Sequence, residues 1–254
     1  MTLVVAGIVR DKELFLASDS RLSCGENSWD YATKIFRLYP TDDYVAYCGD
    51  SLPALLAISQ GLQLLPNTCI LRQSGSSGTS QVTARARAFF RHMQEIMRGF
   101  PAAWGESCTV WMAGYDHRCK KPRLYSFALG ACPREPSEVT LDATTCMGSG
   151  STQAKAILKT IGTPKSGKDI FDAVSTVVAD GKEPTVGGNI QMAVIRRGGS
   201  KTIGFRFGKK PPHVMGFPVQ FVSGMPNVLW FNEQFKRITL RPTMKRGHLS
   251  TGKR

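Results

Sequence analysis

The sequence lacks the features that mark membrane spans, zinc sites and nucleotide-binding loops. It has no run of about 18 apolar residues, the length at which a helix can cross a bilayer, so we expect no membrane association. It has only 4 histidines, and no two of its 7 cysteines are spaced as Cys-x-x-Cys, so no metal site is expected. The Gly148-Ser149-Gly150 stretch is not followed by the Gly-Lys pair of a phosphate-binding loop. We therefore expect no cofactor.

Acidic residues are also few. The chain has 19 Asp and Glu against 33 Lys and Arg, which gives a net charge of +14. No acidic residue occurs from Lys236 onward, where the basic residues are Lys236, Arg237, Arg241, Lys245, Arg246, Lys253 and Arg254. Such a tail is either a solvated extension or a docking segment for nucleic acid or an acidic partner surface, and both interpretations stay open.

The cysteine count and the first residues favour one compartment. The number of cysteines is odd, and Met1–Gly7 carries no basic segment and no cleavage site after a long apolar run. We expect no secretory signal and free thiols, and so a cytoplasmic protein.

The order of apolar patterns predicts the fold. The 254 residues are 42% hydrophobic, enough for one large domain with a sizeable core. The spacing of apolar residues predicts strands over 3–9, 14–17, 34–39, 44–48, 108–114, 124–128, 144–150, 190–196 and 202–207, and helices over 51–65, 81–98, 152–161 and 168–180. This order differs from the regular alternation of a doubly wound sheet. We expect an α+β fold of four layers (αββα), in which two mainly antiparallel sheets pack face to face and a pair of helices lies outside each.

A threonine at position 2 has a specific chemical potential. Removal of Met1, which is usual before a small residue, would make Thr2 the free N-terminus. Its hydroxyl is a nucleophile, and its α-amine, with an ordinary pKa of about 7.7–8.0, is a base near neutral pH. One residue would then supply both groups. A start codon followed by a common residue is the alternative interpretation.

Five short segments, in this order and on this pattern of strands and helices, support the first interpretation. They are Ala17-Ser18-Asp19-Ser20-Arg21, Thr33-Lys34-Ile35-Phe36-Arg37-Leu38, Cys48-Gly49-Asp50, Met112-Ala113-Gly114-Tyr115-Asp116 and Met147-Gly148-Ser149-Gly150-Ser151. Together they resemble the proteasome β-subunit family of N-terminal-nucleophile (Ntn) hydrolases, including the bacterial proteasome-like proteases. The resemblance covers roughly residues 2–207. It implies that the expected four layers are an Ntn-hydrolase sandwich.

The resemblance also implies a role for each matching residue. Thr2 falls on the nucleophile, Lys34 on the catalytic lysine and Asp19 on the carboxylate that pairs with it. The lysine's charge would favour the free amine and the alkoxide-like oxygen of Thr2. Gly49 falls on the glycine whose N–H forms the oxyanion hole. Ser149 falls on the family's serine near the threonine amine, and Glu183 falls on a position in the hydrogen-bond network around that amine.

Three departures leave an inactive relative open. Asp19 lies 17 positions after Thr2, one more than is usual, and an alternative register would place Met1 on the nucleophile position. Val186 stands where the family has a serine before Gly-Gly. Glu183 stands where the family usually has an aspartate.

The resemblance places five uncharged residues around the pocket for the side chain before the cleaved bond: Leu22, Ala32, Phe36, Tyr47 and Leu55. A neutral or apolar side chain would fit such a pocket. Ordinary core packing is the alternative interpretation of these positions.

Residues 208–254 lie past the family pattern and form a Pro- and aromatic-rich segment followed by the basic tail. This extension would wrap over its own domain or over a neighbouring subunit. The resemblance implies a homo-oligomer that acts on polypeptides, and it leaves open a ring and an ATP-dependent unfoldase as partner. The expected function is that of a threonine-type peptidase. An inactive subunit of the same fold, a small-amide hydrolase and a basic nucleic-acid-binding protein are the alternatives.

Overall fold

The computed structural model describes residues 2–24, 26–49, 51–64, 81–100, 108–130, 132–141, 144–219, 225 and 227–240. In these residues four helices combine with two large, mainly antiparallel sheets, which confirms the expected α+β class. The helices are α1 (Ser51–Leu64), α2 (Gln81–Arg98), α3 (Ser151–Ile161) and α4 (Gly167–Asp180). None of them, over the described ranges, is long and apolar enough to cross a membrane.

The larger sheet is built around the first strand of the chain. Its eight strands follow the order β10-β1-β2-β11-β12-β13-β14, and β15 pairs with β12. Their bounds are β1 (Leu3–Val9), β2 (Glu13–Ser18), β10 (Thr144–Gly148), β11 (Gln191–Arg196), β12 (Lys201–Arg206), β13 (His213–Val214), β14 (Phe217–Pro218) and β15 (Val228–Asn232). The pairing of β15 with β12 is parallel, and the other pairings in this sheet's described strands are antiparallel.

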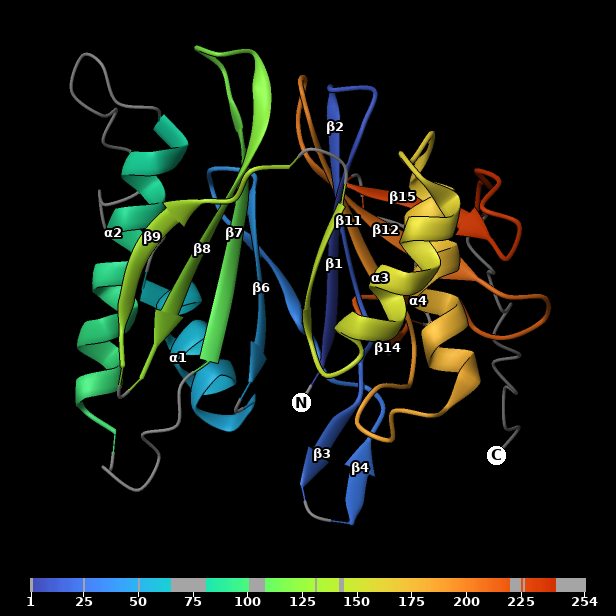
Figure 1. Ribbon diagram of the computed structural model, residues 1–254, viewed down its shortest axis with the longest axis horizontal. Coiled ribbons are helices and arrows are strands. Elements are labelled where there is room, and N and C mark those ends of the chain that lie inside the picture. The colour runs from blue at the N-terminus through green and yellow to red at the C-terminus, as the bar shows by residue number, and fades with distance from the viewer. Residues whose placement is uncertain are drawn as a thin grey trace, which may run out of the picture.

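The smaller sheet has five antiparallel strands in the order β5-β6-β7-β8-β9. They are β5 (Ile35–Leu38), β6 (Asp43–Gly49), β7 (Cys108–Asp116), β8 (Lys121–Leu129) and β9 (Arg134–Glu138). A separate two-stranded hairpin, β3 (Leu22–Cys24) with β4 (Asn27–Trp29), connects the two sheets in the sequence. Figure 1 shows this hairpin projecting beyond the sheets at the bottom of the view.

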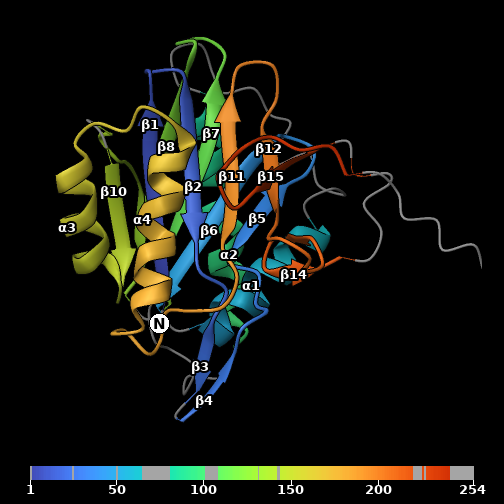
Figure 2. The same ribbon diagram turned by 90° about the vertical axis from the view of Figure 1, so that its right-hand side faces the viewer.

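The helix pairs cover the outer faces of the two sheets, and this arrangement makes four layers. Figure 1 shows α1 and α2 on the outer side of the five-stranded sheet and α3 and α4 on the outer side of the eight-stranded sheet. The two sheets face each other between the helix pairs. Figure 2 looks through these layers, with α4 in front of β1, β2 and β11.

The side chains of β1 point alternately into two apolar clusters. Leu3 and Val5 belong to the apolar cluster beneath α3 and α4, whereas Val4 and Ala6 belong to the cluster between the sheets. Successive side chains of a strand point to opposite faces, and both faces of β1 are covered. The strand therefore reads as a continuous apolar run.

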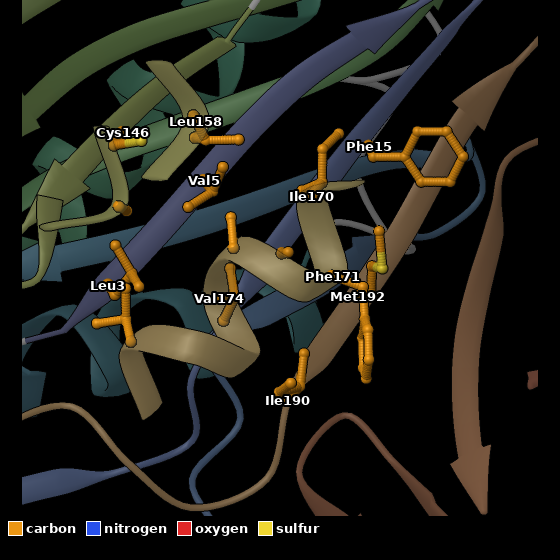
Figure 3. Close-up of a cluster of buried hydrophobic side chains, with 14 of the residues drawn as sticks. Leu3, Val5, Phe15, Cys146, Leu158, Ile170, Phe171, Val174, Ile190 and Met192 are labelled. Atoms are coloured by element: carbon orange, nitrogen blue, oxygen red, sulfur yellow. The ribbon is translucent and has the colours of Figure 1, made fainter. Parts of the chain in front are cut away.

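The cluster beneath α3 and α4 joins elements from distant parts of the chain. Figure 3 shows Leu3 and Val5 of β1 together with Ile170 and Val174 of α4, and with Met192 of β11 close by. A third cluster packs α1 and α2 on the five-stranded sheet. Burial on both sides of both sheets fixes the strand registers, because a one-residue slip would turn apolar side chains away from their core.

The described part of the extension folds back on its own domain. β15 lies along β12, and Trp230 packs so closely on Gly204 that a Cβ at position 204 would lie 2.4 Å from its ring. The Ile238 N–H donates to the Trp230 carbonyl at 2.8 Å. Residues 241–254, which hold most of the basic tail, lie outside the described residues.

Candidate active site

The first two strands place Thr2 beside Asp19. Thr2 directly precedes β1 and Asp19 directly follows β2, and the antiparallel register sets Val4 opposite Ser18. Asp19 Oδ1 lies 3.4 Å from Thr2 Oγ1, a long hydrogen bond. Thr2 is only 2% exposed and Asp19 is fully buried. Met1 lies outside the described residues.

Lys34 reaches the same carboxylate from the other sheet. It directly precedes β5, and its Nζ donates to Asp19 Oδ1 at 2.9 Å and to Oδ2 at 3.0 Å. Both side chains are 0% exposed. The structure therefore brings Thr2, Asp19 and Lys34 together, as the sequence predicts.

Asp19 is also held by the backbone. The N–H groups of Leu3, Arg21 and Gly187 donate to its carboxylate at 2.9, 3.1 and 3.1 Å. A buried charge is costly unless it is paired and hydrogen-bonded, and here an ammonium and three backbone donors surround it. These contacts fix the carboxylate between the two reactive side chains.

Burial sets the protonation behaviour of Lys34. Removal from water lowers the pKa of its ammonium from the usual 10.5, and the nearby Arg21 charge acts in the same direction, while Asp19 opposes the shift. The lysine is thus a cation held in a dry site by a single carboxylate. Such a group can shed its proton more readily than a surface lysine.

Gly148 lets the chain of β10 approach Thr2 closely. A Cβ at this position would lie 1.7 Å from the Thr2 carbonyl oxygen, and φ is +95°, a region that favours glycine. Leu3 pairs with Gly148 in the ladder. The Gly148-Ser149-Gly150 motif is therefore next to Thr2.

Ser149 and Glu183 meet through a residue that the sequence analysis did not single out. Ser149 Oγ lies 2.8 Å from Thr185 Oγ1, which donates to Glu183 Oε1 at 2.6 Å. None of the hydrogen bonds of this relay within the described residues reaches the Thr2 side chain. Val186, at the position of the family's serine, is 1% exposed and packs 3.1 Å from where a Cβ of Gly150 would lie.

Gly49 ends β6 with φ +109° and pairs with Cys108. Its neighbour Cys48 is buried, and this burial raises the pKa of the thiol to about 11, although the charge of Lys34 opposes the shift. Gly49 is therefore one residue from a group that interacts with Lys34. Asp50 lies outside the described residues.

The five expected pocket residues divide into two groups. Phe36, Tyr47 and Leu55 meet in the cluster under α1 and α2, where the rings of Phe36 and Tyr47 stack at 6.3 Å. Leu22 pairs with Trp29 in the hairpin, and the N–H of Ala32 donates to the Ser20 carbonyl.

Tyr47 is the unusual member of the first group. Its hydroxyl is buried with no hydrogen-bond partner among the described residues, and burial raises the pKa of the phenol. Leaving such a group unpaired costs free energy.

A second ion pair, Arg21 with Asp30, lies against the loop after α4. The Arg21 guanidinium donates to both carboxylate oxygens of Asp30, at 2.6 and 3.0 Å, and to the Pro184 carbonyl at 3.2 Å. These bonds tie the segment after β2 to the segment that carries Glu183 and Thr185.

Sequence reasoning missed the residues that complete the site from β11 and the loop before it. Gly187 supplies a donor to Asp19, and Gln191 is a fully buried amide beside it. A polar residue at the start of an apolar strand, Gln191 before Met192-Ala193-Val194-Ile195, was the available signal.

Neither a scan against protein-family models nor a search of curated proteins returns a match for this chain. Within the described residues, no group of three or more His, Cys, Asp or Glu could hold a metal ion. The geometry of Thr2, Asp19 and Lys34 is therefore the basis for assigning a function.

Proposed function

We propose that the chain is an N-terminal-threonine amide hydrolase of the proteasome β-subunit-like type, which cleaves polypeptides by acyl transfer through Thr2. One observation carries the proposal: a threonine hydroxyl, a buried carboxylate and a buried lysine meet at the three positions that the resemblance assigns to the reaction. Their contacts also support the register in which Thr2, not Met1, is the nucleophile.

The layering adds support. Helices, sheet, sheet and helices follow one another as in the four-layer Ntn-hydrolase sandwich, and Thr2 directly precedes β1, which has a neighbouring strand on both sides. Fold alone does not fix a reaction, so this supports the family and the side chains support the chemistry.

In the proposed reaction, the free α-amine of Thr2 accepts the hydroxyl proton as Oγ1 forms a bond to the substrate carbonyl carbon. The Gly49 N–H would donate to the oxyanion. The C–N bond then breaks, the leaving amine takes the proton, and an ester remains on Thr2. Water, deprotonated by the same amine, hydrolyses this ester and restores the hydroxyl.

Lys34 and Asp19 do not exchange atoms with the substrate in this reaction. The positive charge of Lys34 would disfavour protonation of the nearby amine and stabilise negative charge that develops on Oγ1. Asp19 holds that charge in place through two hydrogen bonds.

An intact-mass measurement before and after treatment with a peptide epoxyketone tests the proposal, because that reagent needs both the hydroxyl and the free amine of an N-terminal threonine. We expect a protein without Met1 that gains one adduct. Thr2→Ser should retain the adduct and Thr2→Ala should lose it. Lys34→Ala should slow labelling by about 10²–10⁴-fold, the range for a misplaced base, and the surface variant Lys159→Ala should not.

A catalytically inactive subunit of the same fold is the second candidate, because apolar Val186 is buried at the position of the family's serine. It predicts a retained Met1 and no adduct in the same experiment. That result, in a folded protein, would contradict the hydrolase proposal.

The expected compartment, assembly, substrate and partner are part of the same proposal. We propose a cytoplasmic homo-oligomer, with polypeptides as substrates and an ATP-dependent unfoldase as a candidate partner. The exposed aromatic side chains Trp29 and Phe217, whose rings meet at 6.2 Å, lie on the projecting hairpin and on β14. Exposed aromatic surface of this kind is typical of interfaces.

A further inference from the structure

Gln191 uses every hydrogen-bonding position of its amide in a fully buried setting. Its Nε2 donates to the carbonyls of Asp19 at 3.2 Å and Ala32 at 2.5 Å. Its Oε1 accepts from the N–H groups of Lys34 at 2.8 Å and Ile35 at 3.2 Å. The residue is 0% exposed. One side chain thus holds the backbone of both members of the ion pair.

These bonds connect two different sheets. Asp19 follows β2 of the eight-stranded sheet, and Lys34 precedes β5 of the five-stranded sheet. The distances between Lys34 Nζ and the Asp19 carboxylate depend on how the two sheets are placed relative to each other at this end. Gln191, which begins β11, is bonded to both segments where the side chains cross.

Gly216, in the turn between β13 and β14, lies against the Gln191 amide. A Cβ on Gly216 would lie 3.2 Å from Gln191 Nε2, 3.2 Å from the Ala32 carbonyl and 2.9 Å from Ser20 Cβ, and φ there is +83°. The Gly216 carbonyl accepts from Asn189 Nδ2 at 2.9 Å. A side chain at position 216 would therefore push on the same amide.

We propose that Gln191 is a positioning residue for the reaction: it sets the separation of the Asp19 and Lys34 backbones and so places the lysine charge beside Thr2. The role rests on the proposed function. It does not require Gln191 to touch the substrate.

Two substitutions at Gln191 test this role. Gln191→Met keeps the approximate volume and removes all four hydrogen bonds. A displacement of about 1 Å in a catalytic group costs about 10²-fold, so we expect a loss of that size in kcat with KM unchanged. Gln191→Glu removes both donors at neutral pH, and its protonated form restores one. Its activity relative to the wild type should therefore rise as the pH falls.

Ile195→Ala is the matched control. Ile195 lies on the same strand and the same face, is 0% exposed and belongs to the core between the sheets. It should lower the thermal midpoint without changing the pH profile or the ratio of kcat to KM. If Gln191→Met does not fold, Gly216→Ala applies a smaller push to the amide and should give a smaller loss in kcat, again with KM unchanged.

The titration of Lys34, followed by the ¹³Cε resonance that disappears in Lys34→Arg, needs no activity. We expect its midpoint to move in Gln191→Met and to stay in Ile195→Ala. An inert wild type with this shift would refute the hydrolase proposal, and it would still show that Gln191 places Lys34 relative to Asp19. An active wild type whose kcat and Lys34 midpoint are both unchanged in Gln191→Met would overturn the role of Gln191.

Discussion

At the scale of the residue, the site is organised around one carboxylate. Asp19 accepts hydrogen bonds from the Thr2 hydroxyl, from Lys34 and from three backbone N–H groups, all in a region without water contact. Removing one partner of a buried ion pair leaves the other charge uncompensated. The structure therefore predicts a link between the charge of this residue and the stability of the fold.

Asp19→Asn should reveal that link. The substitution keeps the shape and removes the charge that pairs with Lys34, so we expect a loss of about 3–5 kcal/mol in the free energy of unfolding. Urea denaturation followed by circular dichroism measures it. A change below about 1 kcal/mol, typical of an exposed pair, would show that the pair is solvated.

Lys34 should make stability depend on pH. Its pKa is lowered from 10.5 in the folded protein, so between the lowered value and 10.5 the unfolded chain binds a proton here that the folded chain does not. Stability contributed by this group therefore rises as the pH increases through that window.

Denaturation at several pH values up to 10.5, compared with Lys34→Arg, checks this sign. The guanidinium of the variant stays charged, so the difference in unfolding free energy between wild type and variant should grow with pH. A difference that is constant with pH would contradict the lowered pKa.

Gly148→Ala should displace the nucleophile. Its Cβ would overlap the Thr2 carbonyl, so the two strands must separate, and we expect loss of epoxyketone labelling. Gly198→Ala is the control, because Gly198 has a similar φ of +86° with nothing within 4 Å of an added Cβ. It should cost about 1–2 kcal/mol from backbone strain alone and keep full labelling. Equal labelling of both variants would show that Gly148 does not position Thr2.

At the scale of the element, a buried ion pair connects α2 to the five-stranded sheet. The Arg85 guanidinium donates to both oxygens of Asp43 at 2.6 and 2.9 Å, and Asp43 at the start of β6 is 1% exposed. Burial raises the pKa of this carboxyl, and Arg85 opposes the shift. The pair lies in a different sheet from Thr2 and serves the attachment of the helix.

Arg85→Met should therefore lower stability without affecting the chemistry. We expect a loss of about 3–5 kcal/mol, against less than about 1 kcal/mol for Arg98→Ala, whose partner Glu95 is exposed on the same helix. Labelling of the folded fraction should be unchanged in both variants. A loss of labelling in Arg85→Met but not in Arg98→Ala would mean that the attachment of α2 also affects the residues around Thr2.

The sequence predicted the apolar strands and the four helices up to residue 207, and it missed six of the described strands. The strand expected at Leu3–Val9 and the helix expected at Gln81–Arg98 have these bounds in the structure, because the first is a continuous apolar run and the second has helical spacing. β9 was missed, since its sequence Arg-Glu-Pro-Ser-Glu is polar and mostly exposed. β3, β4, β13, β14 and β15 were also missed, being short or dependent on distant partners.

The residues of the site also divide into those that the sequence indicated and those that only the structure showed. The resemblance singled out Thr2, Asp19 and Lys34, because Asp19 and Lys34 lie within two of the segments that carry it, residues 17–21 and 33–38. Gln191 and Thr185 were not singled out, because their contacts join positions far apart in the chain. Val186 could be recognised as a departure, but its apolar packing against Gly150 required the structure.

At the scale of the whole molecule, three apolar clusters share the two sheets, and the extension completes one of them. Phe207, Leu229, Phe231 and Phe235 pack against the cluster beneath α3 and α4. The described residues of the extension are thus part of the domain's packing.

Trp230→Ala tests this dependence. The indole covers Gly204 and is 8% exposed, so we expect a loss of about 3–5 kcal/mol, the usual range for a buried aromatic. Phe217→Ala, which truncates an aromatic that is 41% exposed, should cost much less. Similar, small losses in both would show that β15 is only loosely attached to β12.

The completion of Asp19 by distant residues has a consequence for biosynthesis. The Gly187 N–H and the Gln191 amide lie 168 and 172 positions after Asp19. At ribosomal rates of about 5–20 residues per second, roughly 10–30 s separate their synthesis from that of Asp19. A nascent chain therefore already contains the threonine, the aspartate and the lysine while it still lacks the groups that hold them in register.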